Sequence, residues 1–223
     1  MEIKAFIFDL DGVLTDTAEY HYQAWKNLAD RLGMKFDRKD NERLKGVSRL
    51  QSLEIILEIN KRQDDFSEEE KICLAEEKNE EYVRLIEQVS PDDVLGGVMP
   101  FLKDARQNGL KLAVASASKN AGTVLDGLQI AGMFDYIADA GRIKNTKPDP
   151  EVFLDCAVHL GVPPASCIGF EDAQAGIEAI HAAGMFAVGI HVAVTGDAPD
   201  LMLSFTEELD YRTVISAAEK KEG

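Results

Sequence analysis

Five short apolar runs, separated by longer polar stretches, form the most regular pattern in this chain. They cover residues 5–8, 110–116, 136–138, 166–170 and 186–190. Runs that are this short and apolar almost throughout are typical of strands buried on both faces of a sheet. The pattern therefore predicts five buried strands, the first of them close to the N-terminus.

Segments of helical character separate the later runs. Residues 99–108, 150–160 and 173–183 each end directly before a glycine, which commonly stops a helix, and residues 119–130 also read as a helix. Strands that alternate with helices favour a parallel sheet covered on both faces. The predicted fold class is α/β, with a Rossmann-like doubly wound parallel sheet as its core.

Residues 17–89 break this alternation because they contain no strand-like run. Apolar residues recur there at helical spacing, with one interruption at 44–49. Nine acids and two lysines between Asp64 and Glu81 indicate a solvated helix face. We therefore predict an all-helical cap domain at 17–89, inserted after the first strand into an α/β catalytic core formed by residues 1–15 plus 92–223.

Composition narrows the functional classes. The 223 residues are 45% hydrophobic, enough for a sizeable core, and carry a formal charge of −16. So acidic a chain argues against nucleic acid or an anionic membrane as its main partner, but not against a small anionic substrate in a locally basic pocket. The three cysteines are widely spaced and form no CxxC motif. With no signal peptide and no long apolar segment, we expect a cytoplasmic protein, acting as a monomer.

Candidate chemistry gathers where the predicted strands end. Asp9 and Asp11 follow the first run, Ser116 ends the second, and Glu171 and Asp172 follow the fourth. Lys147 lies between the third and fourth runs. In a parallel sheet these loops share the carboxyl edge, where α/β proteins place their ligands. Carboxylates, hydroxyls and a lysine together suit metal-assisted phosphoryl transfer.

Each group also has an ordinary structural explanation when taken alone. Asp9 and Asp11 could be turn carboxylates, Ser116 could start a turn or cap a helix, and Lys147 could be a solvated loop lysine. Glu171 and Asp172 could be acids favoured by a helix N-terminus. Their coincidence at matching strand ends is what favours a functional site.

Longer motifs carry a resemblance to a known family. FDLDGVLTDT, SASKN, KPDPE and GFEDAQAGIEAI resemble, in order, the four motifs of the haloacid dehalogenase superfamily, over essentially the whole chain. HYQAW, LKGVSR with the following Ser52, and EKN in the helical insert resemble the cap of the β-phosphoglucomutase family within that superfamily. Related sugar phosphatases share the core motifs, so the cap carries the finer resemblance.

The resemblance implies roles for the core residues. Asp9 would be the nucleophile that becomes an aspartyl phosphate, and Asp11 the general acid/base. One Mg²⁺ per chain would be held by Asp9, the backbone carbonyl of Asp11, Asp172 and Glu171, the last directly or through water. Ser116, Ala117 and Lys147 would hold the transferring phosphate, and Ser118 and Asn120 would contact the second phosphate or the sugar.

The resemblance also implies roles in the helical insert. Arg49 would clamp the distal phosphate, while Gly46, Val47 and Ser52 would line the sugar site. His21 would work with Lys78 to place the acid/base, although His21 taken alone is an ordinary polar helix residue. For Trp25, the only tryptophan, packing within the insert is the preferred interpretation.

The implied activity is interconversion of β-D-glucose 1-phosphate and glucose 6-phosphate through β-glucose 1,6-bisphosphate, which serves as activator and intermediate. An Mg²⁺-dependent phosphatase acting on small phosphosugars remains the alternative, because Asp11 serves both reactions. A non-catalytic sugar-phosphate sensor is the third hypothesis, which the competent residue at every predicted catalytic position argues against.

Overall fold

The computed structural model describes residues 2–44 and 47–221. Its contacts divide the chain into two compact units, one formed by Met1–Asp16 with Ser90–Gly223 and the other by Thr17–Val89. The first unit contains every strand found among the described residues, whereas the second is helical.

The α/β unit is built on a parallel sheet with the strand order β3-β2-β1-β4-β5-β6. The strands are β1 (Ala5–Phe8), β2 (Lys111–Val114), β3 (Tyr136–Ile137), β4 (Cys167–Glu171), β5 (Phe186–Ile190) and β6 (Leu201–Leu203). The five predicted runs each contain a strand, and the fold class is confirmed. The order reverses direction beside β1, the position at which open α/β sheets form a ligand crevice.

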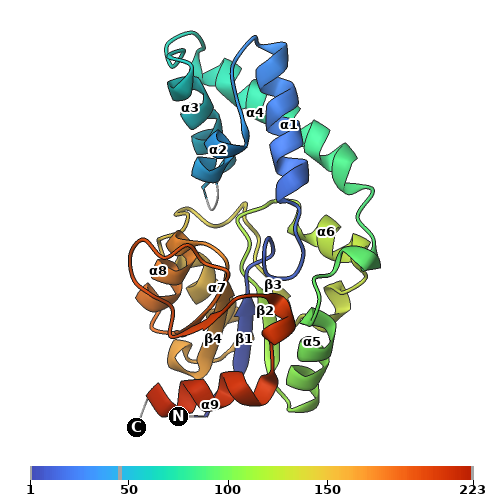
Figure 1. Cartoon of the computed structure of the whole chain (residues 1–223), viewed down its shortest axis with the longest axis vertical. Coiled ribbons are helices and arrows are strands. Elements are labelled where there is room, and N and C mark those ends of the chain that lie inside the picture. The colour runs from blue at the N-terminus through green and yellow to red at the C-terminus, as the bar shows by residue number, and fades with distance from the viewer. Residues whose placement is uncertain (1, 45–46, 222–223) are drawn as a thin grey trace. The chain divides into compact units, whose positions relative to one another are not determined.

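Helices cover both faces of this sheet (Figure 1). α7 (Glu151–Leu160) and α8 (Gln174–Ala182) pack on the face that carries Ala5 and Ile7. On the other face, the Phe6 ring stacks on Phe101 of α5 (Val98–Gln107), 5.3 Å between ring centroids. The alternation of β1 side chains between two apolar layers explains why its sequence is hydrophobic at every position.

Three further helical features complete this unit. α6 (Ala121–Gly127) follows β2, and short 3₁₀ turns lie at Pro91–Asp93, Ala131–Met133, Pro164–Ser166 and Thr206–Glu208. α9 (Tyr211–Lys221) ends the described chain, and the Lys221 ammonium pairs with Asp200. The sequence pattern missed both α9 and β6.

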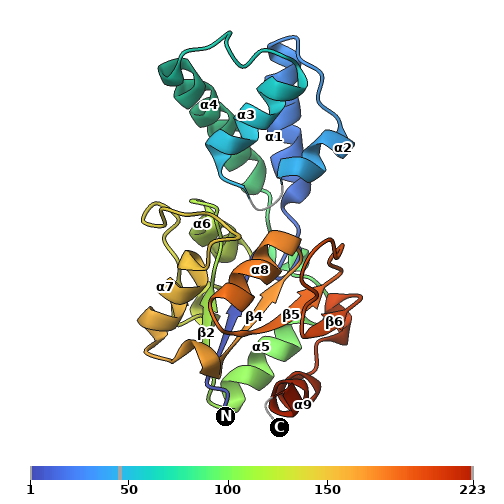
Figure 2. The same cartoon turned by 90° about the vertical axis from the view of Figure 1, so that its left-hand side faces the viewer.

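The helical unit consists of α1 (Ala18–Arg31), the short α2 (Arg38–Asn41), a 3₁₀ turn (Glu42–Leu44), α3 (Arg49–Ile59) and α4 (Glu68–Ile86) (Figure 2). Its core joins Trp25 and Leu28 of α1 to Leu53 and Leu57 of α3 and to Ala75 of α4. Ser48 caps α3 and Ser67 caps α4, each in a capping box. The turn between α3 and α4 is a second break that the sequence pattern did not predict.

The acidic segment in α4 is not solvated throughout. The buried positions of this helix are Lys71, Ala75, Lys78, Tyr82 and Ile86, at the spacing of one helix face. The interpretation of both lysines as part of a solvated face is therefore wrong. Their long methylene stems can lie along apolar surface while the ammonium groups find local partners.

Candidate active site

The carboxyl ends of three neighbouring strands bring the core candidates together. Phe8 of β1 lies beside Val114 of β2 and Phe170 of β4 in the ladder. Beyond the ladder, the Asp9 amide still donates to the Phe170 carbonyl at 2.9 Å. Asp9 therefore leaves the sheet between the segment that leads to Ser116 and the end of β4 that carries Glu171.

Lys147 joins two of these carboxylates. Its Nζ lies 2.5 Å from Asp9 Oδ1 and 2.8 Å from Glu171 Oε2, and the residue is 5% exposed. Burial by itself would lower the pKa of Lys147, but the charges of Asp9 and Glu171 outweigh burial and raise that pKa. Lys147 is therefore a fixed positive charge at the sheet edge rather than a solvated loop lysine.

Three carboxylates form a cluster suited to a cation. Asp9, Glu171 and Asp172 each offer an oxygen, and these atoms lie within 4.8 Å of one another. Burial, followed by the charge of Asp9, raises the pKa of Glu171 to about 8, although Lys147 opposes this shift. Clustered carboxylate oxygens are the ligands that Mg²⁺ prefers, and a divalent cation would relieve their mutual repulsion, so this donor set fits the expected metal.

Two glycines allow the carboxylates to approach so closely. Gly12 has a φ of +76°, and a Cβ on it would lie 2.4 Å from Asp172 Oδ2. A Cβ on Gly176 would lie 2.0 Å from Glu171 Cδ. Both glycines stand in the quoted motifs, but the sequence assigned them no role; only the packing shows that a methyl group at either would displace a cluster carboxylate.

The turn after β1 orders the backbone around Asp11. The Gly12 amide donates to the Thr15 carbonyl at 2.7 Å, and Asp11 pairs with Thr15 in a short bridge. The strand ends at Phe8, so Asp9 and Asp11 both lie beyond β1. Its roles as acid/base and as a backbone metal ligand remain predictions.

The loop after β2 carries the predicted phosphate contacts. Ser116 is buried, and its Oγ accepts from the Ser118 amide at 3.1 Å. Ser118 Oγ in turn accepts from the amide of Asn120, the residue that precedes α6. Ala117 is exposed between them. These turns order the loop at the same sheet edge, so the structural explanation for Ser116 holds, and its contact with phosphate remains a prediction.

In the helical unit the structure brings together three predicted residues. Lys78 Nζ lies 2.7 Å from His21 Nδ1. Burial first, and then the positive charges of Lys78 and Arg49, hold the pKa of His21 well below its usual value. His21 is therefore neutral near pH 7, and Arg49 lies close enough to influence it.

The start of α3 carries the other predicted insert residues. Arg49 is the first residue of this helix and is half-buried, and Ser52 lies one turn later, where its hydroxyl donates to the Ser48 carbonyl at 3.1 Å. A positive side chain beside a helix N-terminus is suited to an anion. Val47 precedes the helix and is partly exposed, while Gly46 lies outside the described residues.

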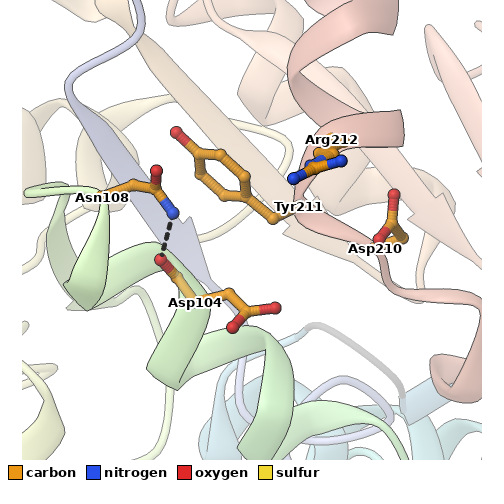
Figure 3. Close-up of a pocket in the computed structure, with 5 residues that line it drawn as sticks. All are labelled: Asp104, Asn108, Asp210, Tyr211 and Arg212. Carbon is orange, nitrogen blue, oxygen red and sulfur yellow. Dashed lines mark hydrogen bonds between the residues drawn. The ribbon is translucent and has the colours of Figure 1, made fainter.

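A separate hollow lies between α5 and α9. Asp104 and Asn108 line it from the end of α5, and Asp210, Tyr211 and Arg212 from the start of α9 (Figure 3). Its volume is about 210 Å³. It contains none of the predicted site residues, so we do not assign the activity to it.

Comparison with known proteins places these motifs in a family. The haloacid dehalogenase-like hydrolase family matches residues 3–184. β-Phosphoglucomutase of Bacillus subtilis is 44% identical over 207 residues, which cover 93% of this chain and 92% of that protein. Fructose-1-phosphate phosphatase of Escherichia coli is 33% identical, over 83% of this chain and 95% of its own.

Solved structures agree. The crystal structure of β-phosphoglucomutase from Clostridium difficile is 48% identical and superposes with a TM-score of 0.93, covering 99% of both chains. The similarity to this mutase is stronger than the similarity to the E. coli phosphatase and includes the helical unit as well as the sheet. The chain therefore belongs to the haloacid dehalogenase-like hydrolases and, among these enzymes, to the β-phosphoglucomutase family.

Proposed function

We propose that this enzyme interconverts β-D-glucose 1-phosphate and glucose 6-phosphate through an aspartyl phosphate and β-glucose 1,6-bisphosphate. The observation that carries the proposal is the cluster of Asp9, Lys147, Glu171 and Asp172 at one sheet edge, with Arg49, His21 and Lys78 present in the helical unit. The names of the B. subtilis and C. difficile relatives support the same substrate class.

The first half-reaction forms the aspartyl phosphate. An Asp9 carboxylate oxygen attacks phosphorus, the bond from phosphorus to the sugar oxygen breaks, and Asp11 gives that oxygen a proton. Lys147, placed 2.5 Å from Asp9, and Ser116 would hold the equatorial phosphate oxygens as negative charge shifts among them. Mg²⁺ bound by Asp9, Glu171 and Asp172 would supply Lewis-acid stabilisation of the same oxygens.

The second half-reaction reverses these proton transfers. Asp11 takes a proton from a hydroxyl of the incoming sugar phosphate while that oxygen attacks the aspartyl phosphate and frees Asp9. Arg49 at the start of α3 would hold the distal phosphate through a bidentate contact, with Ser52 and Val47 beside the sugar. His21 and Lys78 would place the acid/base when the sugar phosphate is bound, so that water gains little catalysis.

A phosphatase that acts on small phosphosugars is the second candidate. The similarity to the E. coli fructose-1-phosphate phosphatase favours it, because the core motifs serve both reactions. A phosphatase would pass the phosphoryl group from Asp9 to water and would need no distal-phosphate clamp. Arg49 therefore distinguishes the two candidates.

A phosphorus NMR time course tests the proposal. Enzyme, Mg²⁺ and β-glucose 1-phosphate with a trace of the bisphosphate should give glucose 6-phosphate and little inorganic phosphate. The Arg49→Ala variant should lose nearly all mutase turnover, whereas Arg43→Ala, which removes an exposed arginine paired with Glu58, should not. Rapid release of phosphate without isomerisation would contradict the proposal and favour the phosphatase.

Expectations about location, oligomeric state and partners belong with this proposal. No helix among the described residues is both long enough and apolar enough to cross a membrane. We propose that the enzyme works in the cytoplasm as a monomer on small phosphosugars, with neither nucleic acid nor membrane as a partner. Size-exclusion chromatography of the active protein tests the oligomeric state.

A further inference from the structure

Lys78 has an unusual environment within the helical unit. The residue is only 3% exposed, and its Nζ lies 4.9 Å from the centroid of the Trp25 ring and 4.8 Å from that of Tyr82. A buried ammonium group needs interactions that replace its lost hydration. The faces of two aromatic rings provide such interactions, so Trp25 does more here than pack the helices.

The imidazole of His21 also contacts Lys78. An ammonium group has only hydrogen atoms to offer, so the 2.7 Å contact between Lys78 Nζ and His21 Nδ1 makes Nδ1 the acceptor. A neutral imidazole whose Nδ1 accepts must carry its proton on Nε2. The lowered pKa of His21 agrees with a neutral ring. The geometry therefore leaves His21 with an N–H to donate and no second lone pair with which to act as a base.

Tyr82 contacts both His21 and Lys78. Its ring stacks on that of His21, with centroids 3.9 Å apart and planes inclined by 20°. Lys78 lies one turn earlier on the same helix, over the same ring. The Tyr82 hydroxyl lies 3.0 Å from Thr17 Oγ1, at the residue before α1, and the Tyr82 side chain has no exposed surface.

We propose that Tyr82 is a positioning residue: its ring holds the His21 imidazole against Lys78, so that His21 is fixed as an Nε2–H donor. The hydroxyl contact with Thr17 adds to the packing that already orients the Tyr82 ring. This inference rests on the proposed function, in which His21 and Lys78 assist phosphoryl transfer, and adds the residue that sets their geometry.

The fixed tautomer has a consequence for the reaction. A donor N–H can bind an oxygen of the sugar phosphate or of the acid/base, but it cannot take a proton from water. A ring free to rotate or to exchange tautomers would present a lone pair, and in the proposed reaction such a base could activate water instead of assisting the sugar phosphate. Loss of the Tyr82 ring should therefore slow transfer to sugar and increase the fraction of phosphoryl groups lost to water.

Two substitutions separate the ring from the hydroxyl. Tyr82→Phe keeps the stacked ring and removes only the contact with Thr17. Tyr82→Met keeps an apolar side chain that can fill the space but removes the aromatic face. Tyr22→Met is the matched control, because Tyr22 is an aromatic residue of α1 that packs on Phe36, 5.8 Å between ring centroids, and lies under Arg38 instead of Lys78.

The first measurement needs no catalysis. Nitrogen NMR of ¹⁵N-histidine-labelled enzyme, with the His21 signals assigned by their loss in His21→Gln, reports which ring nitrogen carries the proton. We expect the Nε2–H tautomer in wild type, Tyr82→Phe and Tyr22→Met, and a mixture of tautomers in Tyr82→Met. A wild-type His21 protonated on Nδ1 would overturn the inference even if Tyr82→Met did not fold.

The second measurement connects the geometry to turnover. Tyr82→Met should lower kcat by about 10- to 100-fold with KM changed less than about twofold, and should release more inorganic phosphate per isomerisation. Tyr82→Phe should stay within about threefold of wild type, and Tyr22→Met should match it. A folded Tyr82→Met with unchanged tautomer, kcat and phosphate release shows that Tyr82 only packs. If wild type lacks mutase turnover, the proposed function fails, whereas the NMR result still decides the role of Tyr82.

Discussion

Lys147 and Lys78 are buried to nearly the same degree, at 5% and 3% exposure, and each ammonium group lies over an aromatic ring, but the hydrogen-bonding groups found beside them differ. Lys147 lies between the carboxylates of Asp9 and Glu171. Lys78 contacts a neutral imidazole and two aromatic rings. The two carboxylates are negatively charged partners of the Lys147 ammonium group. The aromatic rings stabilise the Lys78 ammonium group, but they carry no negative charge that would favour protonation of the neighbouring His21.

In the proposed reaction this difference would give the two lysines two kinds of contribution. At the sheet edge, opposite charges are held close together before substrate arrives, which is the arrangement needed to stabilise charge that moves between phosphate oxygens. In the helical unit, a cation fixes the tautomer of a neutral donor. Mutations should therefore affect stability and pH dependence most in the α/β unit, and geometry most in the helical unit.

The largest loss of turnover is expected from replacing Asp9, the carboxylate beside Lys147 that is the proposed nucleophile. Asp9→Asn replaces the attacking carboxylate by an amide, which is not nucleophilic enough to displace a sugar oxygen. Turnover should fall by about 10⁴-fold or more, with no aspartyl phosphate detected by mass spectrometry. Asp92→Asn, an exposed acid of the same unit, is the control. An active Asp9→Asn would exclude the proposed nucleophile.

Lys147→Met should be nearly as damaging and should also weaken the fold. Without Lys147, Asp9 and Glu171 lose their shared cation, and the free energy of unfolding should fall by about 3 kcal/mol. We expect kcat to fall by about 10²- to 10³-fold because the phosphate loses its fixed charge. Urea unfolding and kinetics measure both quantities, with exposed Lys144→Met as control. Unchanged stability would show that the ion pairs contribute nothing to the fold.

Lys78→Met should disturb the geometry of His21 while leaving the free energy of unfolding nearly unchanged. A methionine can pack between the Trp25 and Tyr82 rings, so the free energy of unfolding should change by only about 1 kcal/mol. The His21 Nδ1 loses its donor, however, and kcat should fall by about 10- to 100-fold. A stability loss as large as that of Lys147→Met would remove the contrast between the two lysines.

The metal-free protein should lose stability as pH rises from about 5 to 8. The pKa of Glu171 is about 8 in the folded protein, above its ordinary value of 4.5, so the folded state binds more protons than the unfolded state over this range. The free energy of unfolding then falls with pH, by at most about 1.4 kcal/mol per pH unit for this group. Melting curves in a chelator, and again with Mg²⁺, test this, because a cation that favours ionised Glu171 should flatten the slope. A rising slope without metal would contradict the assignment.

The smallest effect is expected at Lys71, a third buried lysine and a matched control on the same helix as Lys78. Its ammonium pairs with Glu54 at 2.8 Å and Glu68 at 3.1 Å at the edge of the unit. Ion pairs near solvent contribute little. Lys71→Met should leave kcat and the His21 tautomer unchanged, and a large loss of activity would mean that α4 lysines act by a general effect.

The sequence predicted the sheet well because strands buried on both faces leave an unmistakable apolar run. The run at 186–190 matches β5 residue for residue. β6 was missed because its three residues lie at the sheet edge, where one strand partner and partial exposure impose little pattern. α9 was missed because its buried face consists of only Val214 and Ala218.

The site residues also divide into those that the sequence could predict and those that it could not. Strand ends predicted that Asp9, Lys147 and Glu171 would share one edge, since parallel strands align their carboxyl ends. The burial of Lys78 could not be predicted from charge pattern, because it depends on rings contributed by both α1 and α4. The spacing of Lys78 and Tyr82 by four residues was visible, but it does not reveal the His21 ring stacked on the same tyrosine.

The most direct measurement follows the fate of the phosphoryl group on Asp9. Enzyme is loaded with radiolabelled phosphate from labelled bisphosphate, mixed with β-glucose 1-phosphate or with buffer, and quenched on the millisecond scale. The proposed function predicts rapid transfer of label into sugar bisphosphate, and slow appearance of inorganic phosphate when sugar phosphate is absent. Release of label as inorganic phosphate at the same rate with and without the sugar phosphate would contradict it.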